Sequence, residues 1–392
     1  MVASADRPRL NGAGDDAPPA VAAVVVNFNA GDALARCVES VLAQKLGVRL
    51  VVVDNASSDG SADRVGELYG RRDDVRVLRN DDNPGFARAV NQGAADPACR
   101  DARHLLILNP DCEFMPGALR SLLAALEANP KAGLAGPLVV DRDGQPMRGT
   151  LRRFPDPWRS FMQFSGLWRL GRRWPLFQGV EPVAALPSAL TEAEAVSGAC
   201  MLLRREAFDD AGGLDPDYGL HCEDLDLMYR LREQGKPSLF VPAARVYHLQ
   251  GLSSRSRPVW VHWQKHRGMQ RFFTKFQAGR YAWPLRWTVV AAIWARFALT
   301  LPLALLRGRR RPPERGRRGD RLPARCQGSR RRDHPDRGHA DRAGRRPEPG
   351  GLAPAAGHRA DRRHPFSVGR RASDGLQRSG ELRCTGGRVR VH

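Results

Sequence analysis

Four segments that read as β-strands constrain the fold of this chain more than any other feature of its sequence. The unbroken apolar run at 105–108 is typical of a parallel strand that is covered on both faces. These segments are VAAVVV (21–26), VRLVVV (48–53), VRVLRN (75–80) and HLLILN (104–109). Helical patterns follow them at 31–44, 61–70, 85–95 and 116–129. Because strands that alternate with helices form parallel sheets, the sequence predicts an α/β fold with a mostly parallel central sheet flanked by helices.

Polar residues stand at or shortly after the ends of three predicted strands, namely Asp54, Asn83 and Asp111. The carboxyl ends of parallel strands share one edge of a sheet, which is where ligands usually bind. The stretch NPGF (83–86) also begins a helix, and a helix N-terminus attracts phosphate. Taken singly, each residue is explained by a turn or a helix cap. Taken together they favour a pocket for a nucleoside diphosphate, in which Asp111 holds a divalent cation through oxygen.

A second group of acidic residues, Glu223, Asp224 and Asp226, stands at the start of a predicted helix. Acidic residues in a first helical turn interact favourably with the helix dipole, which is the structural explanation. Three clustered carboxylates exceed that need, and one whose pKa is raised by like-charged neighbours is suited to act as a general base. His248 follows a short apolar strand and precedes a Gly/Ser turn, a position compatible with metal or phosphate contact as well as with a structural role.

The net charge of +21 is concentrated in residues 307–392, which contain 25 Arg, no Lys and nine acidic residues. This composition cannot form a core, so a disordered tail is expected. A frame-shifted reading of a GC-rich gene, a genuine disordered tail and a nucleic-acid-binding arm are the three explanations. The lack of Lys and of repeated motifs favours the first, and no nucleic-acid partner is expected. Residues 1–20 lack the apolar core of a signal peptide and are expected to be a disordered N-terminus.

Residues 287–306 (WTVVAAIWARFALTLPLALL) are about as long as a membrane-spanning helix. Arg296 lies in the middle of this segment and Pro302 interrupts it, and both disfavour a spanning helix. Large apolar residues recur on one helical face. An amphipathic helix at the membrane interface is therefore expected for residues 281–306, ahead of a spanning helix or a packing helix of a soluble fold.

Seven ordered segments resemble family 2 glycosyltransferases of the GT-A fold, and most of all the rhamnosyltransferase-like enzymes of bacterial cell-surface polysaccharide synthesis. The resemblance covers residues 21–280, which are expected to form the glycosyltransferase domain. The segments are VVVNFNAGDALARCVESVLAQ, VVVDNASSDGS, NPGFARAVNQG, LILNPDCEF, VSGACMLLRREAFDDAGGLDPDY, CEDLDLMYRLREQG and VYHLQGLSS. In this resemblance the aromatic and basic insert at 152–174 belongs to acceptor recognition, whereas its residues alone are equally compatible with a packing insert.

The resemblance implies a role for each candidate site residue. Asp224 would be the catalytic base, with Glu223 as its rival, and Asp111 and His248 would bind Mg²⁺ or Mn²⁺. Asp54 would contact the base or ribose of the nucleotide. The other residues implied in binding the nucleotide-sugar are Asn27, Asn55, Asn83, Gly85, Asn91 and Asn109.

The implied function is that of an inverting, metal-dependent glycosyltransferase of cell-envelope glycan synthesis. The expected donor is dTDP-rhamnose, and the expected acceptor is a lipid-linked or polysaccharide hydroxyl. The protein would be cytoplasmic and peripheral at the cytoplasmic face of the inner membrane. The alternatives are a catalytically impaired binding protein that keeps the fold, and a nucleic-acid-binding protein that acts through its Arg-rich tail.

Overall fold

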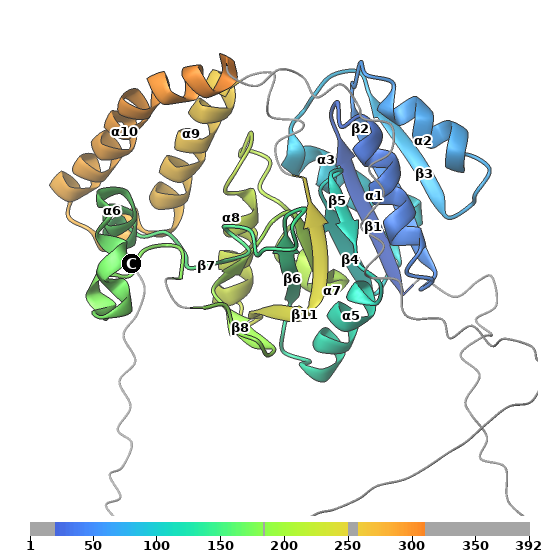
Figure 1. The fold of residues 1–392 in the computed structure, drawn as a ribbon, viewed down its shortest axis with the longest axis horizontal. Helices are drawn as coiled ribbons and strands as arrows, with labels where there is room; N and C mark the ends of the chain where they lie inside the picture. The colour runs from blue at the N-terminus through green and yellow to red at the C-terminus, as the bar shows by residue number, and fades with distance from the viewer. Residues whose placement is uncertain (1–19, 183–184, 250–257, 310–392) are drawn as a thin grey trace, which may run out of the picture. The chain divides into compact units, whose positions relative to one another are not determined.

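The computed structural model of this protein describes residues 20–182, 185–249 and 258–309. Nearly all of the expected disordered N-terminus and of the expected Arg-rich tail lies outside the described residues. In the described part, a central sheet carries helices on both faces, and a pair of long helices lies beside it (Figure 1).

The first half of the sheet is parallel, as the alternation of strands and helices predicts. Its strands have the order β3-β2-β1-β4. Their bounds are Val21–Asn27 (β1), Val48–Asn55 (β2), Val75–Asn80 (β3) and His104–Leu108 (β4). The helices that follow these strands are α1 (Asp32–Leu42), α2 (Ser61–Tyr69), α3 (Phe86–Ala95) and α4 (Pro97–Arg100). Because Asn27 is in register with Asp54, the polar ends of β1 and β2 meet at one edge.

The second half of the sheet is mixed, because β10 runs antiparallel to both of its neighbours, β4 and β6. The strands of this half are β5 (Cys112–Phe114), β6 (Leu134–Val140), β8 (Thr191–Ala193), β10 (Cys200–Arg204) and β11 (Ser238–His248). Strand β11 is parallel to β6 and antiparallel to β5 and β8. The predicted parallel arrangement therefore describes β1 to β4, and the rest of the sheet mixes both directions.

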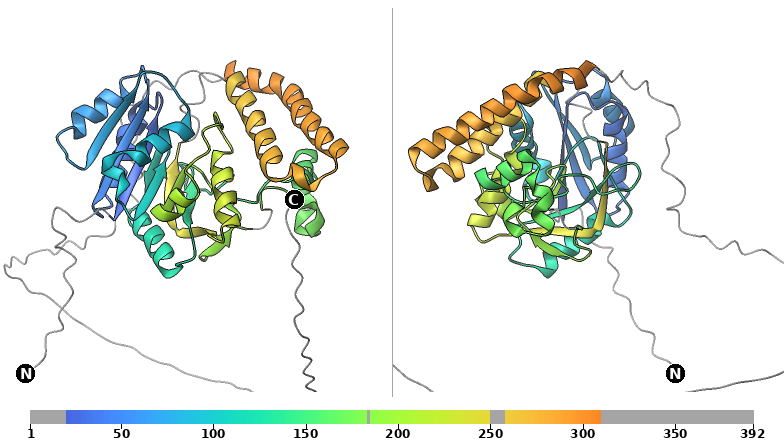
Figure 2. Two further views of the ribbon diagram at one scale, coloured as in Figure 1. Left: turned by 180° about the vertical axis from the view of Figure 1, so that it is seen from behind. Right: turned by 60° about the vertical axis from the view of Figure 1, so that its left-hand side comes forward.

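The other elements cover the sheet or lie beside it (Figure 2). The helices are α5 (Ala118–Ala128), α6 (Pro157–Ser165), α7 (Arg205–Asp210), α8 (Glu223–Glu233), α9 (Pro258–Phe276) and α10 (Trp283–Arg309), with short 3-10 helices η1 (Leu167–Arg172), η2 (Pro175–Phe177) and η3 (Ala278–Arg280). A separate two-stranded sheet pairs β7 (Leu151–Arg152) with β9 (Ala195–Val196). This small sheet fixes the start of the 152–174 insert.

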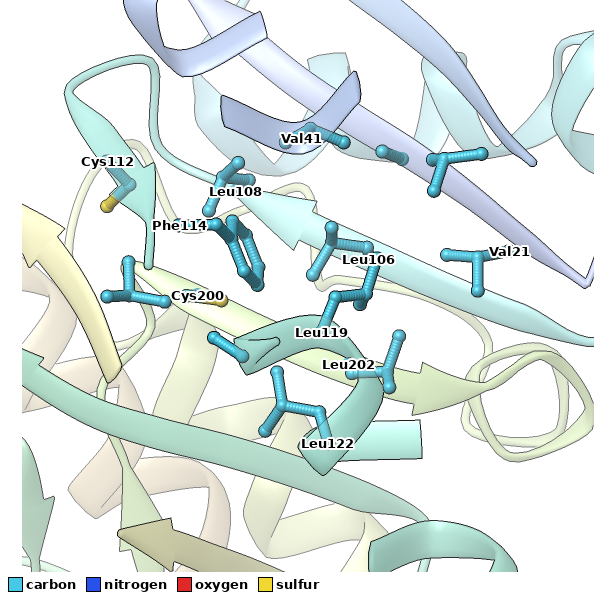
Figure 3. Close-up of a cluster of buried hydrophobic side chains, with 14 of the residues drawn as sticks. Val21, Val41, Leu106, Leu108, Cys112, Phe114, Leu119, Leu122, Cys200 and Leu202 are labelled. Carbon is cyan, nitrogen blue, oxygen red and sulfur yellow. The ribbon is translucent and has the colours of Figure 1, made fainter. Parts of the chain in front are cut away.

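Apolar side chains are buried on both faces of the sheet, so alternate residues of β1 belong to two different clusters. One cluster joins β4 to α5 and contains Leu106, Leu108, Leu119 and Leu122, all without exposed surface (Figure 3). The other joins the opposite face to α3 and α8. Each fully buried Leu contributes about 1.5–3 kcal/mol relative to an exposed one. The strand ends that carry the polar residues are therefore held on a rigid platform.

Helices α9 and α10 form a hairpin beside the sheet (Figure 1, Figure 2). Phe272 anchors α9, since its ring packs against those of Phe154 and Tyr229. Arg296 of α10 faces the protein: its guanidinium lies over the ring of Phe164, 3.8 Å from the centroid, and 3.0 Å from Nε2 of His266. The cation in the middle of the apolar segment is thus turned away from the exposed face of α10.

The exposed face of α10 is apolar. In the described part of the chain, Trp283–Leu305 is the one helical segment long and apolar enough to cross a membrane, with a mean hydropathy of 1.8. Only 6% of its apolar window is buried. Large exposed side chains on this helix are Trp283, Leu285, Trp287, Leu299, Leu303 and Leu305.

Candidate active site

The Asn109-Pro110-Asp111 turn joins β4 to the short strand β5 and places Asp111 beside His248. The N–H of Asn109 donates to the carbonyl of Ala199 at 2.9 Å, and the N–H of Cys112 closes the turn on the Asn109 carbonyl at 3.2 Å. Because β5 pairs antiparallel with β11, Cys112 lies opposite His248. Oδ1 of Asp111 is consequently 3.1 Å from Nε2 of His248. The two residues predicted as metal ligands are neighbours, and Asn109 contributes its backbone to their turn.

The donor atoms at this turn fit a hard divalent cation. Those of Asp111, Cys112 and His248 all lie within 4.8 Å of one another, the one such group in the described ranges. The Cys112 thiol is fully buried and donates to the Ala199 carbonyl at 3.4 Å. Burial, and then the charge of Asp111, raises the pKa of this thiol, so it stays protonated and is a poor ligand. A carboxylate oxygen and an imidazole nitrogen remain, which suits Mg²⁺ or Mn²⁺ completed by phosphate oxygens or water.

Asn27, at the end of β1, is the centre of a hydrogen-bonded cluster at the predicted nucleotide edge. Its Nδ2 lies 2.7 Å from Oδ1 of Asp54 and 2.8 Å from Oγ of Ser61. The Ser57 hydroxyl donates to the same Asp54 oxygen at 2.6 Å. Oδ1 of Asn27 is buried without a partner in the described structure. The fold brings Asn27 and Asp54 together and leaves one acceptor at this edge unused.

Asn55, Asn83 and Gly85 meet at the adjacent end of β2. Nδ2 of Asn55 donates to Oδ1 of Asn83 at 3.3 Å, and the Gly85 N–H donates to the same oxygen at 3.0 Å. Gly85 has a φ of 95°, and a Cβ built on it would lie 3.2 Å from the Gly219 carbonyl oxygen. A side chain at this position would be both strained and crowded. The loop before α3 therefore packs closely on the loop before α8.

Asn91 is engaged elsewhere. Its Nδ2 donates to the carbonyl of Leu214 at 2.7 Å, and its Oδ1 accepts from the Leu214 N–H at 2.9 Å. Both ends of the amide are thus paired with one backbone residue, which fixes the loop after α7 to α3. The observed bonds give Asn91 a positioning role, and its contact with a nucleotide remains a prediction.

Glu223 and Asp224 begin α8 directly after two residues with left-handed backbone, His221 with φ 70° and Cys222 with φ 72°. Such conformations cost non-glycine residues about 1–3 kcal/mol each and persist where the surroundings enforce them. Helix α9 is in contact with this turn, because a Cβ built on Gly268 would lie 2.7 Å from the His221 carbonyl oxygen. Packing of α9 therefore helps to hold the turn that presents both carboxylates.

The two carboxylates have opposite electrostatic surroundings. Asp224 forms a largely buried ion pair with Arg152 of β7 and accepts from the Leu225 N–H at 2.8 Å. Burial opposes its ionisation, but Arg152 outweighs burial and lowers the pKa of Asp224. Burial, and then the charge of Asp224, raises the pKa of Glu223 to about 8, and its Oε2 is buried with no described partner. At neutral pH Asp224 is ionised and Glu223 is mostly protonated.

Two consecutive residues connect the carboxylate pair to the metal-ligand turn. Gly198 is in contact with Asp224, because a Cβ built there would lie 2.5 Å from Oδ2 of Asp224. Ala199 accepts hydrogen bonds from both Asn109 and Cys112. The backbone of these two residues therefore links the Asp224 carboxylate to the turn that carries Asp111, although the two aspartates come from different halves of the chain.

Replacement of Gly198 by Ala is expected to lower kcat by about 10²-fold, the cost of misplacing a catalytic group by about 1 Å. The added Cβ would also lie 2.7 Å from the Cβ of Asp224, so the carboxylate has to move. The measurement is steady-state kinetics together with urea unfolding. Gly66→Ala is the matched control, because a Cβ on Gly66 has no atom within 4 Å. Wild-type kcat in Gly198→Ala would show that catalysis does not depend on the position of Asp224.

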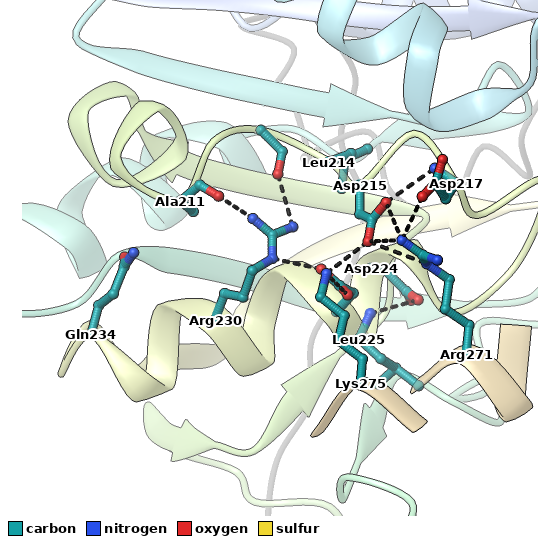
Figure 4. Close-up of polar contacts among 12 residues, drawn as sticks. Ala211, Leu214, Asp215, Asp217, Asp224, Leu225, Arg230, Gln234, Arg271 and Lys275 are labelled. Atoms are coloured by element: carbon teal, nitrogen blue, oxygen red, sulfur yellow. Dashed lines mark hydrogen bonds and ion pairs between the residues drawn. The ribbon is translucent and has the colours of Figure 1, made fainter. Parts of the chain in front are cut away.

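Asp226, the third acid of the cluster, has no exposed surface and pairs with two cations, Arg230 at 2.6 Å and Lys275 at 2.7 Å. Lys275 also binds Asp215 at 2.7 Å, and Arg271 binds the same carboxylate at 2.9 Å (Figure 4). Removal of one member of a buried ion pair is strongly destabilising, because the remaining charge is left buried without a partner. This network ties α8 to α9, so Asp226 has a structural role distinct from that of its two neighbours.

Sequence reasoning missed two contributors to this site, Arg152 and Lys275. Arg152 belongs to the basic and aromatic insert at 152–174, whose composition was compatible with substrate recognition and with packing alike. Lys275 lies on a helix far along the chain from Asp226. Neither ion pair has a local sequence signal, because it depends on elements that meet only in the folded protein.

Comparisons of this chain with known proteins match it to glycosyltransferases. The family described as Glycosyl transferase family 2 matches residues 22–212. The N-acetylglucosaminyl-diphospho-decaprenol L-rhamnosyltransferase of Mycobacterium tuberculosis is 32% identical over 303 residues, which cover 74% of this chain and 95% of that protein. The pre-mycofactocin glycosyltransferase of the same organism is 30% identical over 205 residues, covering 52% of this chain and 37% of that protein.

Among solved structures, similarity extends to the mannosyltransferase PcManGT from Pyrobaculum calidifontis in complex with GDP-Man and Mn²⁺. The alignment covers 76% of this chain and 77% of that one, with a TM-score of 0.45 and 19% sequence identity.

Proposed function

Because this chain belongs to glycosyl transferase family 2 and has a GT-A-type fold, we propose that it is an inverting, metal-dependent enzyme of cell-envelope glycan synthesis. It transfers a sugar from a nucleotide-sugar to a hydroxyl of a lipid-linked acceptor. The donor we propose is dTDP-rhamnose, since the mycobacterial relative is named as an L-rhamnosyltransferase. The same name specifies a sugar linked through diphosphate to a polyprenol, which is the acceptor class we propose here.

The observation that carries this proposal is the short step from Asp224 to Asp111 through Gly198 and Ala199. A glycosyl transfer needs a base for the acceptor hydroxyl and a site for the leaving diphosphate, separated by the donor sugar. The Asp224 carboxylate, which Arg152 keeps ionised, contacts Gly198, and the next residue binds the turn that carries the Asp111–His248 pair. A base and a diphosphate site joined in this way suit a transferase better than a binding protein without catalysis.

In the proposed reaction, Asp224 accepts the proton of the acceptor hydroxyl while that oxygen attacks the anomeric carbon of the donor. The bond from this carbon to the phosphate oxygen breaks, and its electron pair leaves with the nucleoside diphosphate. Attack from the opposite face inverts the configuration in one displacement. Arg152 keeps Asp224 ionised and oriented. A cation held by Asp111 and His248 would neutralise charge on the departing diphosphate.

The donor is tested by release of nucleoside diphosphate from a panel of dTDP-, UDP- and GDP-sugars, with Mg²⁺ or Mn²⁺ and a membrane extract as the source of acceptor. Release from dTDP-rhamnose alone is expected. Release from a different donor would replace the proposed sugar and leave the transferase assignment in place. A folded, nucleotide-binding protein that releases nothing from any donor would contradict the proposed function.

We further propose that α10 attaches the protein to the cytoplasmic face of the inner membrane. The helix is long and apolar, its large side chains are exposed, and Arg296 is turned toward α9. One face of α10 packs against α9, so only the opposite face is available to lipid. A helix that lies in the membrane interface also buries only one face in lipid. This position would bring the hairpin, and the enzyme, to an acceptor that resides in the membrane.

Trp287→Glu combined with Leu299→Glu should abolish binding to vesicles of phosphatidylethanolamine and phosphatidylglycerol. The two residues are 69% and 78% exposed, so folding should be unaffected. Removal of two apolar anchors, at about 1.5–3 kcal/mol each, predicts a loss of more than about 100-fold in co-sedimentation affinity. Leu68→Glu, on the exposed surface of α2, is the control. Equal binding by the wild type and the double variant would rule out α10 as the attachment surface.

A further inference from the structure

Buried polar atoms without hydrogen-bond partners gather around the start of α8. In the described part of the chain such atoms include Arg152 Nε, Glu223 Oε2 and Gln264 Oε1, which come from β7, α8 and α9. Helix α9 reaches this place, because a Cβ built on Gly219 would overlap the Gln264 amide. Folded proteins pair most buried polar groups. Unpaired donors and acceptors on three elements that come into contact here are suited to a polar ligand.

Lys265, the residue after Gln264, is an exposed cation that forms no hydrogen bond or ion pair with any described residue. The other lysine of α9, Lys275, pairs with two carboxylates at 2.7 Å. Partial desolvation, and then the charge of Arg296, lowers the pKa of Lys265. An anion placed beside the ammonium would offset both effects.

Helix geometry places Lys265 on the side of α9 that faces the turn before α8. Residues three positions apart share a face of an α-helix. Lys265 is three positions before Gly268, where a built Cβ would lie 2.7 Å from the His221 carbonyl oxygen and 3.5 Å from Cys222. The charges of Lys265 and Arg152 both act on the thiol of Cys222, next to Glu223 and Asp224. Strand β7 therefore meets the start of α8, and α9 packs against the turn just before it.

We infer that Lys265 and Arg152 bind the diphosphate of the lipid-linked acceptor, with the acceptor sugar between this group and Asp224. The inference rests on the proposed function and assigns the residues that recognise its acceptor. In a sugar linked through diphosphate to a lipid, one sugar ring separates the phosphate from the attacking hydroxyl. A cationic pair beside the base matches that arrangement, because Arg and Lys are the common ligands of phosphate oxygens.

The position of α9 also suits the lipid part of such an acceptor. Helix α9 packs along α10, whose outer face is apolar and exposed. With α10 at the membrane interface, the lipid chain remains in the bilayer while the diphosphate reaches Lys265. An acceptor that ends in a neutral polysaccharide has no group that would use this cation.

The test compares two acceptors that carry the same sugar, N-acetylglucosaminyl-diphospho-farnesol and octyl N-acetylglucosaminide. Lys265→Gln should raise KM for the diphosphate acceptor by about 10- to 100-fold, the range for one charge-assisted hydrogen bond. Its kcat should change little, and its KM for the octyl glycoside should equal that of the wild type. Arg267→Gln removes an exposed cation from the same helix, where Arg267 stacks on Trp263, and should leave both KM values unchanged.

Two further measurements separate the sources of the diphosphate. Lys265→Gln should bind dTDP with wild-type affinity, and weaker binding of dTDP would assign the cation to the donor and overturn the inference. In EDTA, titration calorimetry with inorganic pyrophosphate should show weaker binding to Lys265→Gln than to the wild type or Arg267→Gln. Equal pyrophosphate binding by all three proteins would also overturn it. Because this readout needs no turnover, it remains decisive even where the donor panel contradicts the proposed function.

Discussion

Replacement of Asp224 by Asn is expected to lower kcat for sugar transfer by about 10²–10⁴-fold, the contribution of a well-placed general base. Asn has the same shape but keeps only one acceptor oxygen, whereas Arg152 and the Leu225 N–H bind different oxygens of Asp224, so one of these two bonds is lost. Asn also cannot take the proton of the acceptor. Binding of the nucleoside diphosphate should therefore stay close to that of the wild type. The measurement is steady-state release of nucleoside diphosphate, with calorimetry for nucleotide binding.

Folding has to be followed in parallel, because Arg152 loses its charged partner in Asp224→Asn. Urea unfolding of the variant identifies conditions in which it is fully folded, and kcat is compared there. Asp217→Asn, which removes an exposed carboxylate from the rim of the network in Figure 4, is the matched control. Near-wild-type turnover by folded Asp224→Asn would refute the role of Asp224 as the base.

The pH profile distinguishes Asp224 from its rival Glu223. Burial and the charge of Asp224 raise the pKa of Glu223 to about 8, so Glu223 gains its charge only as the pH rises through that value. A base with this pKa would make kcat climb toward a plateau above about pH 8. With Asp224 as the base, whose pKa is lowered by Arg152, kcat should be nearly constant across neutral pH. A climbing profile that disappears in Glu223→Gln would transfer the role to Glu223.

The second large effect is expected at the metal-ligand turn. Asp111→Asn should reduce kcat by about 10³-fold, because a Lewis acid contributes several kcal/mol to charge stabilisation in the transition state. His248→Ala keeps the carboxylate and should instead raise the metal concentration that gives half-maximal activity. The measurement is the initial rate against Mg²⁺ or Mn²⁺ concentration after dialysis into EDTA.

Glu113→Gln is the control for this pair, since Glu113 lies two positions from Asp111 and pairs with Arg36 at 2.8 Å. Its metal dependence should match that of the wild type. Full activity of the wild-type protein after removal of divalent cations would contradict the assignment of Asp111 and His248 as metal ligands.

The parallel half of the sheet could be predicted from sequence because its signals are local. The strands β1, β2 and β4 are rich in apolar residues, each strand from β1 to β4 ends in a polar turn, and helices follow along the chain. The placement of Asp54 and Asp111 at strand ends followed from the same pattern. The direction of β10 could not be predicted, because an apolar run has the same composition whichever way the strand runs.

Contacts between residues far apart in the sequence also could not be predicted. His248 meets Asp111 because β11 pairs antiparallel with β5, a register that neither segment specifies alone. From the sequence, Asp226 had two explanations, a helix-dipole interaction and base catalysis. The structure adds a third, a buried pair with Lys275 of α9. Ion pairs of this kind depend on which helices pack together, so they become visible only in the folded protein.

The contact between α9 and the His221–Cys222 turn has a consequence for how this enzyme divides into modules. The segment that matches the family ends at residue 212, before the carboxylate pair, before His248 and before α9. A fragment cut after β11 would retain every residue assigned to the chemistry. It would lack α9, which packs against the turn that presents Asp224. Substitutions in α9 are therefore expected to change the rate of catalysis without altering a residue that takes part in the reaction.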